Sequence, residues 1–392
     1  MKEGMITTRD LRPRITGVIL AKDVVPVPYE SPWLLHPGPP LSGFLDALYP
    51  VQQKTLQGLI QWEHWSVDER KVTRSVELLP SQDFHVATPL VGWVSPSMLL
   101  WVVEDPLTHL KGYAPVNEGL GPSLRMGAVS QAIFDRQDWL NRVFAPVVTE
   151  LLYDRDIPLW PIIQQALYMG DELHMRSVAA SYVFHSLLMQ PLLASGRLGA
   201  LNLTDQTLFF QVICGNPMAF LNIFMAMTQV YFQYWAQQHS QTNRITAIGA
   251  NGSAWGFKCQ NDRDHWQLID APFAVPGRPI EPSFLPIIGD SFACEVLGFG
   301  GQIIHNAPGL WRDIGYHPPK SPASVFRPTL CGQELPVVLP GEETFLKGGA
   351  CPADLPHMVF DTACVGLDGG FLGAGRVDGS LWHKVTRDEC YG

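Results

Sequence analysis

The sequence has few charged residues, and they are thinly spread. Only 16% of the 392 residues are Asp, Glu, Lys or Arg, and no cluster of Lys and Arg interrupts the net charge of −10. Nucleic acid and anionic membranes are therefore not expected as partners. A small anionic substrate stays possible, because a local arginine pocket does not require a basic protein. With 46% apolar residues, the composition is typical of a compact protein with a sizeable core.

Cysteine pairs and a leader-like segment are also missing. The seven cysteines stand at positions 214, 259, 294, 331, 351, 364 and 390, and no CxxC pair occurs. This odd number and these wide spacings indicate a reduced protein rather than a disulfide scaffold or a structural zinc site. The first residues, MKEGMITTRDLRPRITG, lack the apolar stretch of a signal peptide. We therefore expect a cytoplasmic location.

Charge is absent altogether between Asp205 and Arg244. The stretch MAFLNIFMAMTQVYFQYWA within it is long enough to span a bilayer. However, amide side chains recur through it, and no basic flank sets an orientation. We therefore predict that residues 206–238 form a buried helix and not a membrane span.

The order of patterns predicts an α+β fold in three parts. Residues 1–145 read as a mixed α/β part, with a core strand ending in MLLWVVE (98–104) and a helix from 128 to 153. Residues 146–240 read as helical, with helices over 158–169, 171–195 and 205–238. Residues 241–392 read as a C-terminal α+β part. There, Asn251-Gly252 predicts a hairpin, and residues 265–273 could supply a third strand.

The stretch MGDELHMRSVAAS (169–181) places four ionisable residues among apolar runs. In a helix, Asp171 and His174 would share one face, and Glu172 and Arg176 would pair at a spacing of four. This could be a general base with an oriented imidazole beside a substrate-binding arginine. The alternative is a helix N-terminus that is capped by Asp171 and followed by a salt bridge, and spacing alone favours it. No second His–carboxylate pair has matching spacing, so no metal is predicted.

Four other polar stretches are candidates for the same site. NEGLGPSLRMG and GDSFACEVLGFGG combine acids with glycines that let backbone amides approach a ligand. Each could also be an ordinary polar turn. TDQ resembles a helix cap whose side chains reach inward, and the hairpin turn contributes an asparagine and a glycine. We expect all of them to line one pocket with the 171–176 motif. The candidates are Asn117, Glu118, Arg125, Asp205, Gln206, Asn251, Gly252, Asp290, Ser291, Glu295, Gly300 and Gly301.

Taken together, these motifs resemble a known bacterial family, YlbE and its relatives. The resemblance rests on HPGPP (36–40), NEGLG and RMG (117–127), MGDELHMR (169–176), TDQ (204–206), NG to G (251–256), IGDS to GG (289–301), APG (307–309) and ACVGLD (363–368). It covers most of residues 30–370. The final glycine-rich segment of the family is reduced here to GAGRVDG (373–379).

The resemblance implies a component of oxamate carbamoyltransferase in purine-nitrogen catabolism. It also implies an FdrA-like partner subunit. The implied reaction splits carbamoyl-oxamate with phosphate as co-substrate, without a further cofactor, and a homo-oligomer is expected. In that chemistry Arg125 and Arg176 suit anionic groups, and His174, steered by Asp171 beside Glu172, suits proton transfer. The alternatives are a non-catalytic scaffold or regulatory subunit, and an amidohydrolase that uses water in place of phosphate.

Overall fold

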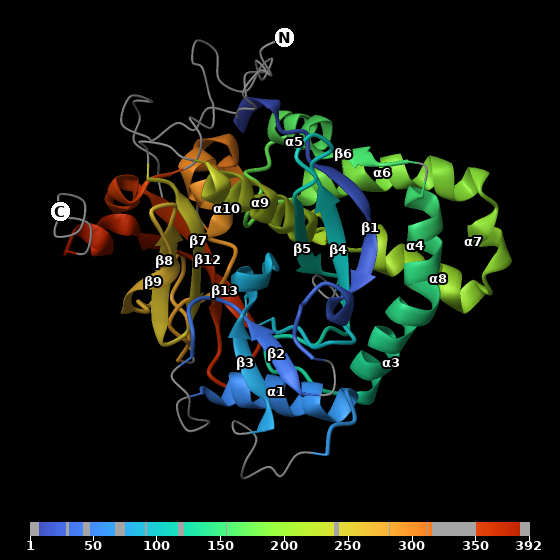
Figure 1. Cartoon of the computed structure of the whole chain (residues 1–392), viewed down its shortest axis with the longest axis horizontal. Coiled ribbons are helices and arrows are strands. Elements are labelled where there is room, and N and C mark those ends of the chain that lie inside the picture. The colour runs from blue at the N-terminus through green and yellow to red at the C-terminus, as the bar shows by residue number, and fades with distance from the viewer. Residues whose placement is uncertain are drawn as a thin grey trace.

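The computed structural model describes most of the chain. The described residues are 8–28, 31–41, 48–66, 75–90, 92–116, 121–153, 155–238, 243–281, 283–311, 313–315 and 350–384. They form an α+β fold in which several small sheets meet around a central helix (Figure 1). The predicted fold class is therefore confirmed.

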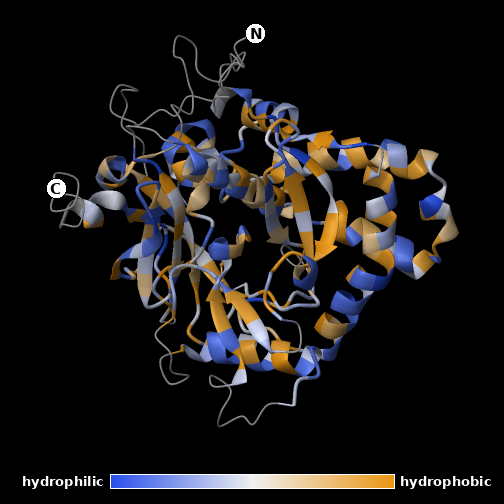
Figure 2. Ribbon diagram, viewed as in Figure 1, coloured by the Kyte–Doolittle hydropathy of each residue, from blue (hydrophilic) through white to orange (hydrophobic). Residues whose placement is uncertain are grey.

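The first sheet carries the predicted core strand. Its order is β5 (Lys111–Pro115), β4 (Leu99–Glu104), β1 (Arg14–Leu20) and β6 (Ile157–Pro158), with every neighbour antiparallel. The first five residues of β4 are buried, because a strand covered on both faces can be apolar throughout. β1 and β4 are accordingly drawn mainly in orange in Figure 2.

The central helix α9 (Ala219–Gln237) fills the space between this sheet and the next (Figure 1). It has 16 buried residues out of 19, which explains its lack of charge. Its amides serve the first sheet, because Asn222 donates to the carbonyl of Pro115 and Gln233 to that of Lys111. Among the described residues, no helix combines the length and the apolar character that crossing a membrane requires.

The prediction of one helix over 206–238 is wrong in its boundaries. The run forms two helices, α8 (Leu203–Ile213) and α9, separated by Cys214–Met218. Gly215 and Pro217 lie in the interruption, and both residues disfavour a continuous helix.

The second sheet contains the predicted hairpin. Its order is β11 (Ile288–Gly289), β7 (Ile245–Asn251), β8 (Ala254–Cys259) and β9 (Asp262–Asp270). The turn at Asn251-Gly252 and the third strand are thus confirmed. A third sheet joins β10 (Val275–Pro276) and β12 (Val359–Val365) to opposite edges of β13 (Phe371–Asp378). This C-terminal hairpin was not predicted.

The remaining elements lie outside these sheets. The parallel pair of β2 (Trp33–His36) and β3 (Glu77–Pro80) packs near α1 (Pro50–Trp62) in the lower part of Figure 1. The predicted helix over 128–153 is confirmed as α3 (Gln131–Trp139), a π-helical turn (Leu140–Phe144) and α4 (Ala145–Leu152). Because the largest hydrophobic core draws on all three predicted parts, the division at 145 and 240 stays a prediction.

The middle of the chain is helical, as predicted, but one helix begins later than expected. α5 (Leu159–Tyr168) confirms the helix over 158–169. The helix expected over 171–195 is wrong at its start, because α6 begins at Val178 and ends at Ala194. Residues 169–177 form a loop between α5 and α6, and the short α7 (Arg197–Ala200) follows.

Candidate functional site

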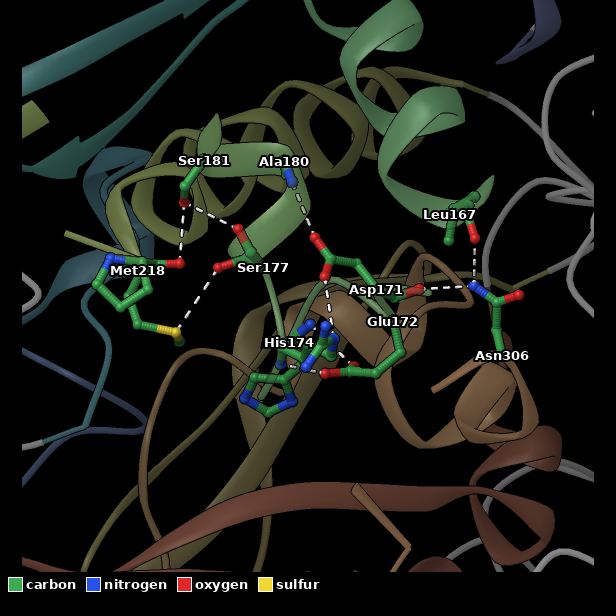
Figure 3. Close-up of polar contacts among 11 residues, drawn as sticks. Leu167, Asp171, Glu172, His174, Ser177, Ala180, Ser181, Met218 and Asn306 are labelled. Atoms are coloured by element: carbon green, nitrogen blue, oxygen red, sulfur yellow. Dashed lines mark hydrogen bonds and ion pairs between the residues drawn. The ribbon is translucent and has the colours of Figure 1, made fainter. Parts of the chain in front are cut away.

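The 169–177 loop is a tightly held buried turn. Gly170 has a φ of +92° and Leu173 a φ of +70°, a conformation that is strained for a leucine. Leu173 is buried, and its amide donates to the carbonyl of Arg176. Asn306 braces the loop from outside by donating to the carbonyls of Leu167 and Asp171, both at 2.7 Å (Figure 3). The surrounding structure thus maintains the strained turn.

Asp171 caps a helix, although not the one expected. Its Oδ2 accepts the amide of Ala180 at 2.8 Å in the first turn of α6 (Figure 3). Burial raises the pKa of Asp171 to about 6, although the α6 amides and Arg176 act in the opposite direction. The capping interpretation is therefore confirmed in its role and wrong in its spacing, since Asp171 lies seven residues before Val178, the first residue of its helix.

Arg176 is the exposed member of the motif. Its Nε lies 3.3 Å from Oδ1 of Asp171, and its side chain is 41% exposed, whereas that of Asp171 is fully buried. Asp171 is its only side-chain partner among the described residues. One edge of the guanidinium thus lies against a buried carboxylate, in an ion pair without hydrogen-bond geometry, and the side chain is exposed enough for its terminal nitrogens to meet a ligand. The Glu172–Arg176 salt bridge predicted from the spacing is absent among the contacts of the described residues.

Glu172 organises the loop backbone. Its two carboxylate oxygens accept the amides of His174, at 2.9 Å, and Arg176. Burial first, and then the charge of Asp361, raise the pKa of Glu172 well above its usual value. The carboxylate is fully buried, so it shapes the turn that presents Arg176.

His174 pairs with Glu295 and not with Asp171. Its Nδ1 lies 2.7 Å from Oε1 of Glu295, and the two side chains are 3% and 0% exposed. Burial lowers the pKa of His174, but the charge and hydrogen bond of Glu295 outweigh it, so the net direction is upward. The partner that orients the imidazole is therefore 121 residues away, which corrects the Asp171–His174 pair expected from a helix.

The glycines after Glu295 are needed for close packing. Glu295 lies on α10 (Ala293–Val296), and Gly300 and Gly301 begin the 3-10 segment Gly300–Asn306. A Cβ at Gly300 would lie 2.3 Å from Oε1 of Glu295, and one at Gly301 would lie 2.2 Å from the carbonyl of Val359. Neither space could accept a side chain. These predicted glycines thus hold the buried acid in place rather than form an open anion cradle.

Asp361 belongs to the same cluster and was missed. It lies on β12, is fully buried, and its amide donates to Oε1 of Glu295 at 3.1 Å. Burial first, and repulsion from Glu295 second, raise its pKa to about 8. A single acid inside the apolar run VFDTACV is the signal that could have identified it.

Asp290, by contrast, is the acceptor at the centre of a second buried group. Its oxygens accept hydrogen bonds from two backbone amides, two hydroxyls and one side-chain amide, at 2.5–3.0 Å. The donors are Gly38 N, Thr88 N, Ser81 Oγ, Thr88 Oγ1 and Gln82 Nε2. Burial raises the pKa of Asp290, and these bonds oppose the shift. Because the carboxylate is fully occupied, its contacts are structural and leave little for a substrate. Ser291, next to it, is also buried.

The remaining predicted residues are placed as follows. Asn251 closes the hairpin turn and donates to Pro39 at 2.9 Å, and Gly252 follows with a φ of +87°. Asp205 and Gln206 lie in the first turn of α8, where Asp205 accepts from the Trp139 indole at 2.9 Å. Arg125 is half-buried, and Asn117 and Glu118 lie outside the described residues.

The structure therefore joins part of the expected site. Six candidates form one cluster with Arg176, namely Asp171, Glu172, His174, Glu295, Gly300 and Gly301. Asp290 and Asn251 both hold the 38–40 segment in a second group. α8, with Asp205 and Gln206, lies on the far right of Figure 1, away from α10. The catalytic and binding roles of all these residues stay predictions.

Two further observations concern ligands. Within the described residues, no group of three His, Cys, Asp or Glu side chains is arranged to hold a metal ion. A cavity of about 860 Å³ lies between β1, α4 and the end of α6. None of the predicted site residues lines it.

Comparison with known proteins places the chain in a class of carbamoyltransferase subunits. It belongs to the family described as oxamate carbamoyltransferase subunit AllG, whose model matches residues 76–291, more than half of the chain. The Escherichia coli K12 protein of that name is 27% identical over 374 residues, which are 92% of this chain and 84% of the relative. The resemblance to a carbamoyltransferase component is thus confirmed, whereas the YlbE name stays a prediction.

Two further relatives carry no stated activity. The uncharacterized protein YahG of Escherichia coli K12 is 25% identical over 315 residues. The match covers 77% of this chain and 64% of that relative. A crystal structure of a conserved protein of unknown function from Enterococcus faecalis V583 has a TM-score of 0.82 and 20% identity. The match covers 96% of this chain and 94% of that one, and it shows the fold alone.

Proposed function

We propose that this chain is the substrate-binding subunit of a carbamoyltransferase that uses a small anionic amide, such as carbamoyl-oxamate, and phosphate. The observation that carries the proposal is Arg176, a half-exposed guanidinium in an ion pair with a buried carboxylate. A guanidinium can donate two parallel hydrogen bonds and is therefore suited to a carboxylate or phosphate group. The name of the similar Escherichia coli protein supplies the reaction class.

The reaction requires the protein to supply a cation near the reacting anions and a proton for the departing nitrogen. A phosphate oxygen attacks the carbamoyl carbon, the bond from that carbon to the oxamate nitrogen breaks, and the departing nitrogen takes up a proton. Two anions must approach each other, so a cation near them lowers the barrier. Arg176 supplies the cation. The imidazole of His174, held by Glu295, is the group that we propose supplies the proton.

A non-catalytic subunit is the second candidate, and one observation favours it. His174 is 3% exposed, and Glu295 and Glu172 are fully buried. In that case the cluster would only shape the loop that carries Arg176. An FdrA-like partner would then perform the chemistry.

The test is a phosphate-dependent assay for carbamoyl phosphate, with carbamoyl-oxamate as substrate. The chain is assayed alone and together with an FdrA-like protein, with and without phosphate. Carbamoyl phosphate formed in a mixture that requires this chain supports the proposal. Release of oxamate without phosphate would indicate an amidohydrolase instead. Full activity of the partner without this chain would contradict any role in the reaction.

We also propose how the chain assembles and where it acts. It binds an FdrA-like partner, forms a homo-oligomer and acts in the cytoplasm, in purine-nitrogen catabolism. Gel filtration of the chain, alone and mixed with the partner, measures the first two.

A further inference from the structure

We propose that Asp361 is a positioning residue whose carboxyl group stays protonated at neutral pH and holds Glu295, and through it His174. Its effect on catalysis rests on the function proposed above. The protonation of Asp361 does not depend on that function and can be measured independently.

The contacts of Asp361 place it at the centre of the buried cluster. Its backbone amide donates to Oε1 of Glu295 at 3.1 Å, the same oxygen that meets Nδ1 of His174. Both of its own carboxyl oxygens are buried and lack a hydrogen-bond partner among the described residues. Oε2 of Glu295 is likewise buried without a partner there. A proton on Asp361 would turn one of its oxygens into a donor, in the same buried cluster as this unused acceptor.

The charges that surround Asp361 require such a proton. The loop contributes Glu172 and His174, and α10 contributes Glu295 with Cys294 next to it. Three buried carboxyl groups thus face one imidazole. Even with the imidazole charged, three ionised carboxylates would leave two negative charges uncompensated in the interior, which is strongly unfavourable.

The neighbouring strand offers no compensation. Arg376 is the register partner of Asp361 on β13, but its guanidinium donates to the carbonyls of Ile314 and Gly315. No ion pair joins it to Asp361 among the described contacts. The printed hydrogen bonds of the Arg376 guanidinium are thus made to these two carbonyls and not to Asp361.

The distribution of donors shows which acid holds the proton. Glu172 accepts two backbone amides, which favours its charged form. Glu295 accepts from the imidazole and from the amides of Asp361 and Gly301, with the same effect. Asp361 accepts nothing from the described residues. On these donors protonation is least unfavourable on Asp361. Burial raises the pKa of Asp361 to about 8, and it also raises the pKa of Glu172 well above its usual value, so it is the donors and not the pKa shifts that single out Asp361.

The direct test is infrared spectroscopy of the whole chain. A protonated carboxylic acid absorbs at a carbonyl frequency separate from that of a carboxylate. We expect the wild type to show this band at pH 7 and to lose it with a midpoint of about pH 8. Asp361→Asn should remove the component of the band with that midpoint, and Asp378→Asn, an exposed acid on the same hairpin, should not. If Asp361→Asn left that component unchanged, the proton would belong to another buried acid such as Glu172, and the proposal would be overturned. Absence of the band from the wild type at pH 7 would overturn the proposal.

A second measurement tests the positioning role. Asparagine is neutral and can donate to Glu295, so Asp361→Asn should keep at least tenfold more carbamoyl-transfer activity than Asp361→Ala at pH 7. The alkaline fall of the wild-type pH profile should move upward in Asp361→Asn. Equal activity of the two variants would overturn the positioning role. If the band is present but no variant or wild type transfers carbamoyl groups, the function proposed above fails and the protonation of Asp361 stands.

Discussion

Replacement of Asp290 by alanine should destabilise the fold strongly rather than weaken substrate binding. The change removes a buried carboxylate that accepts five hydrogen bonds. The amides of Gly38 and Thr88 cannot turn to another acceptor, and each buried unpaired donor costs roughly 1–3 kcal/mol. Gln82 keeps its bond to Ile248 at 2.8 Å, and the two hydroxyls lie 3.4 Å apart and can bond to each other.

The net loss follows from these terms. The two amides account for roughly 2–6 kcal/mol, and removing a desolvated carboxylate offsets a part of this. We expect the free energy of unfolding to fall by about 3–5 kcal/mol, a large share of the roughly 5–15 kcal/mol of a typical domain. Urea unfolding followed by circular dichroism measures it. Asp205→Ala, which removes a half-buried acid on α8, is the matched control and should cost roughly 1 kcal/mol. A loss at Asp290 no larger than at Asp205 would refute the reasoning.

Three other expectations concern the cluster. His174→Ala should lower turnover by roughly 10²–10⁴-fold if the imidazole transfers a proton. Near-normal turnover with an intact circular dichroism spectrum would leave it a structural role. Arg176→Lys should mainly raise the Michaelis constant, because lysine cannot reproduce the bidentate fork; a change confined to turnover would argue against substrate binding. Stability should fall as the pH rises from about 4 to about 8, because folded Asp361 keeps a proton that the unfolded chain has released, and the raised pKa of His174 adds to the fall above pH 6.5. The slope is up to roughly 1.4 kcal/mol per pH unit for each group, and a flat profile in urea unfolding would contradict the buried charges.

The regular elements could be predicted where the sequence pattern was local. MLLWVVE, the Asn251-Gly252 turn and the apolar run of α9 each follow from side-chain periodicity or turn chemistry over a few residues. The hairpin of β12 and β13 was missed because glycines weaken its strand pattern. The Asp368-Gly369-Gly370 turn between the strands was the available signal.

The site could be predicted only in part, because the spacing of its residues was interpreted as that of a helix, whereas residues 169–177 form a loop. Asp171 and His174 were paired by their three-residue spacing, which assumes a helix. The strained φ of Leu173 makes the segment a turn, so the carboxylate faces α6 and the imidazole faces α10. The true partner, Glu295, was named as a candidate, but no local pattern could join residues 121 positions apart.

Asp290 shows how far a local motif leaves the partners of an acid undetermined. A Gly-Asp opening before a glycine-rich stretch suggested a ligand site, whereas its partners come from the 38–40 and 81–88 segments. Acids at functional sites and acids that tie distant loops together use the same residue types. The number of hydrogen bonds that a buried carboxylate already accepts distinguishes the two kinds of acid, and it is visible only in the structure.

The most direct test of the proposed function is the affinity of oxamate for the chain, measured by calorimetry with and without Arg176. The wild type, alone or with an FdrA-like partner, should bind oxamate. Arg176→Gln should weaken binding roughly 10–100-fold, since charge-assisted hydrogen bonds contribute about 1.5–3 kcal/mol. Arg197→Gln, which removes an exposed arginine paired with Glu150, is the matched control and should leave the affinity unchanged. Equal affinity of Arg176→Gln and the wild type, or no binding by the wild type in either form, would contradict the account.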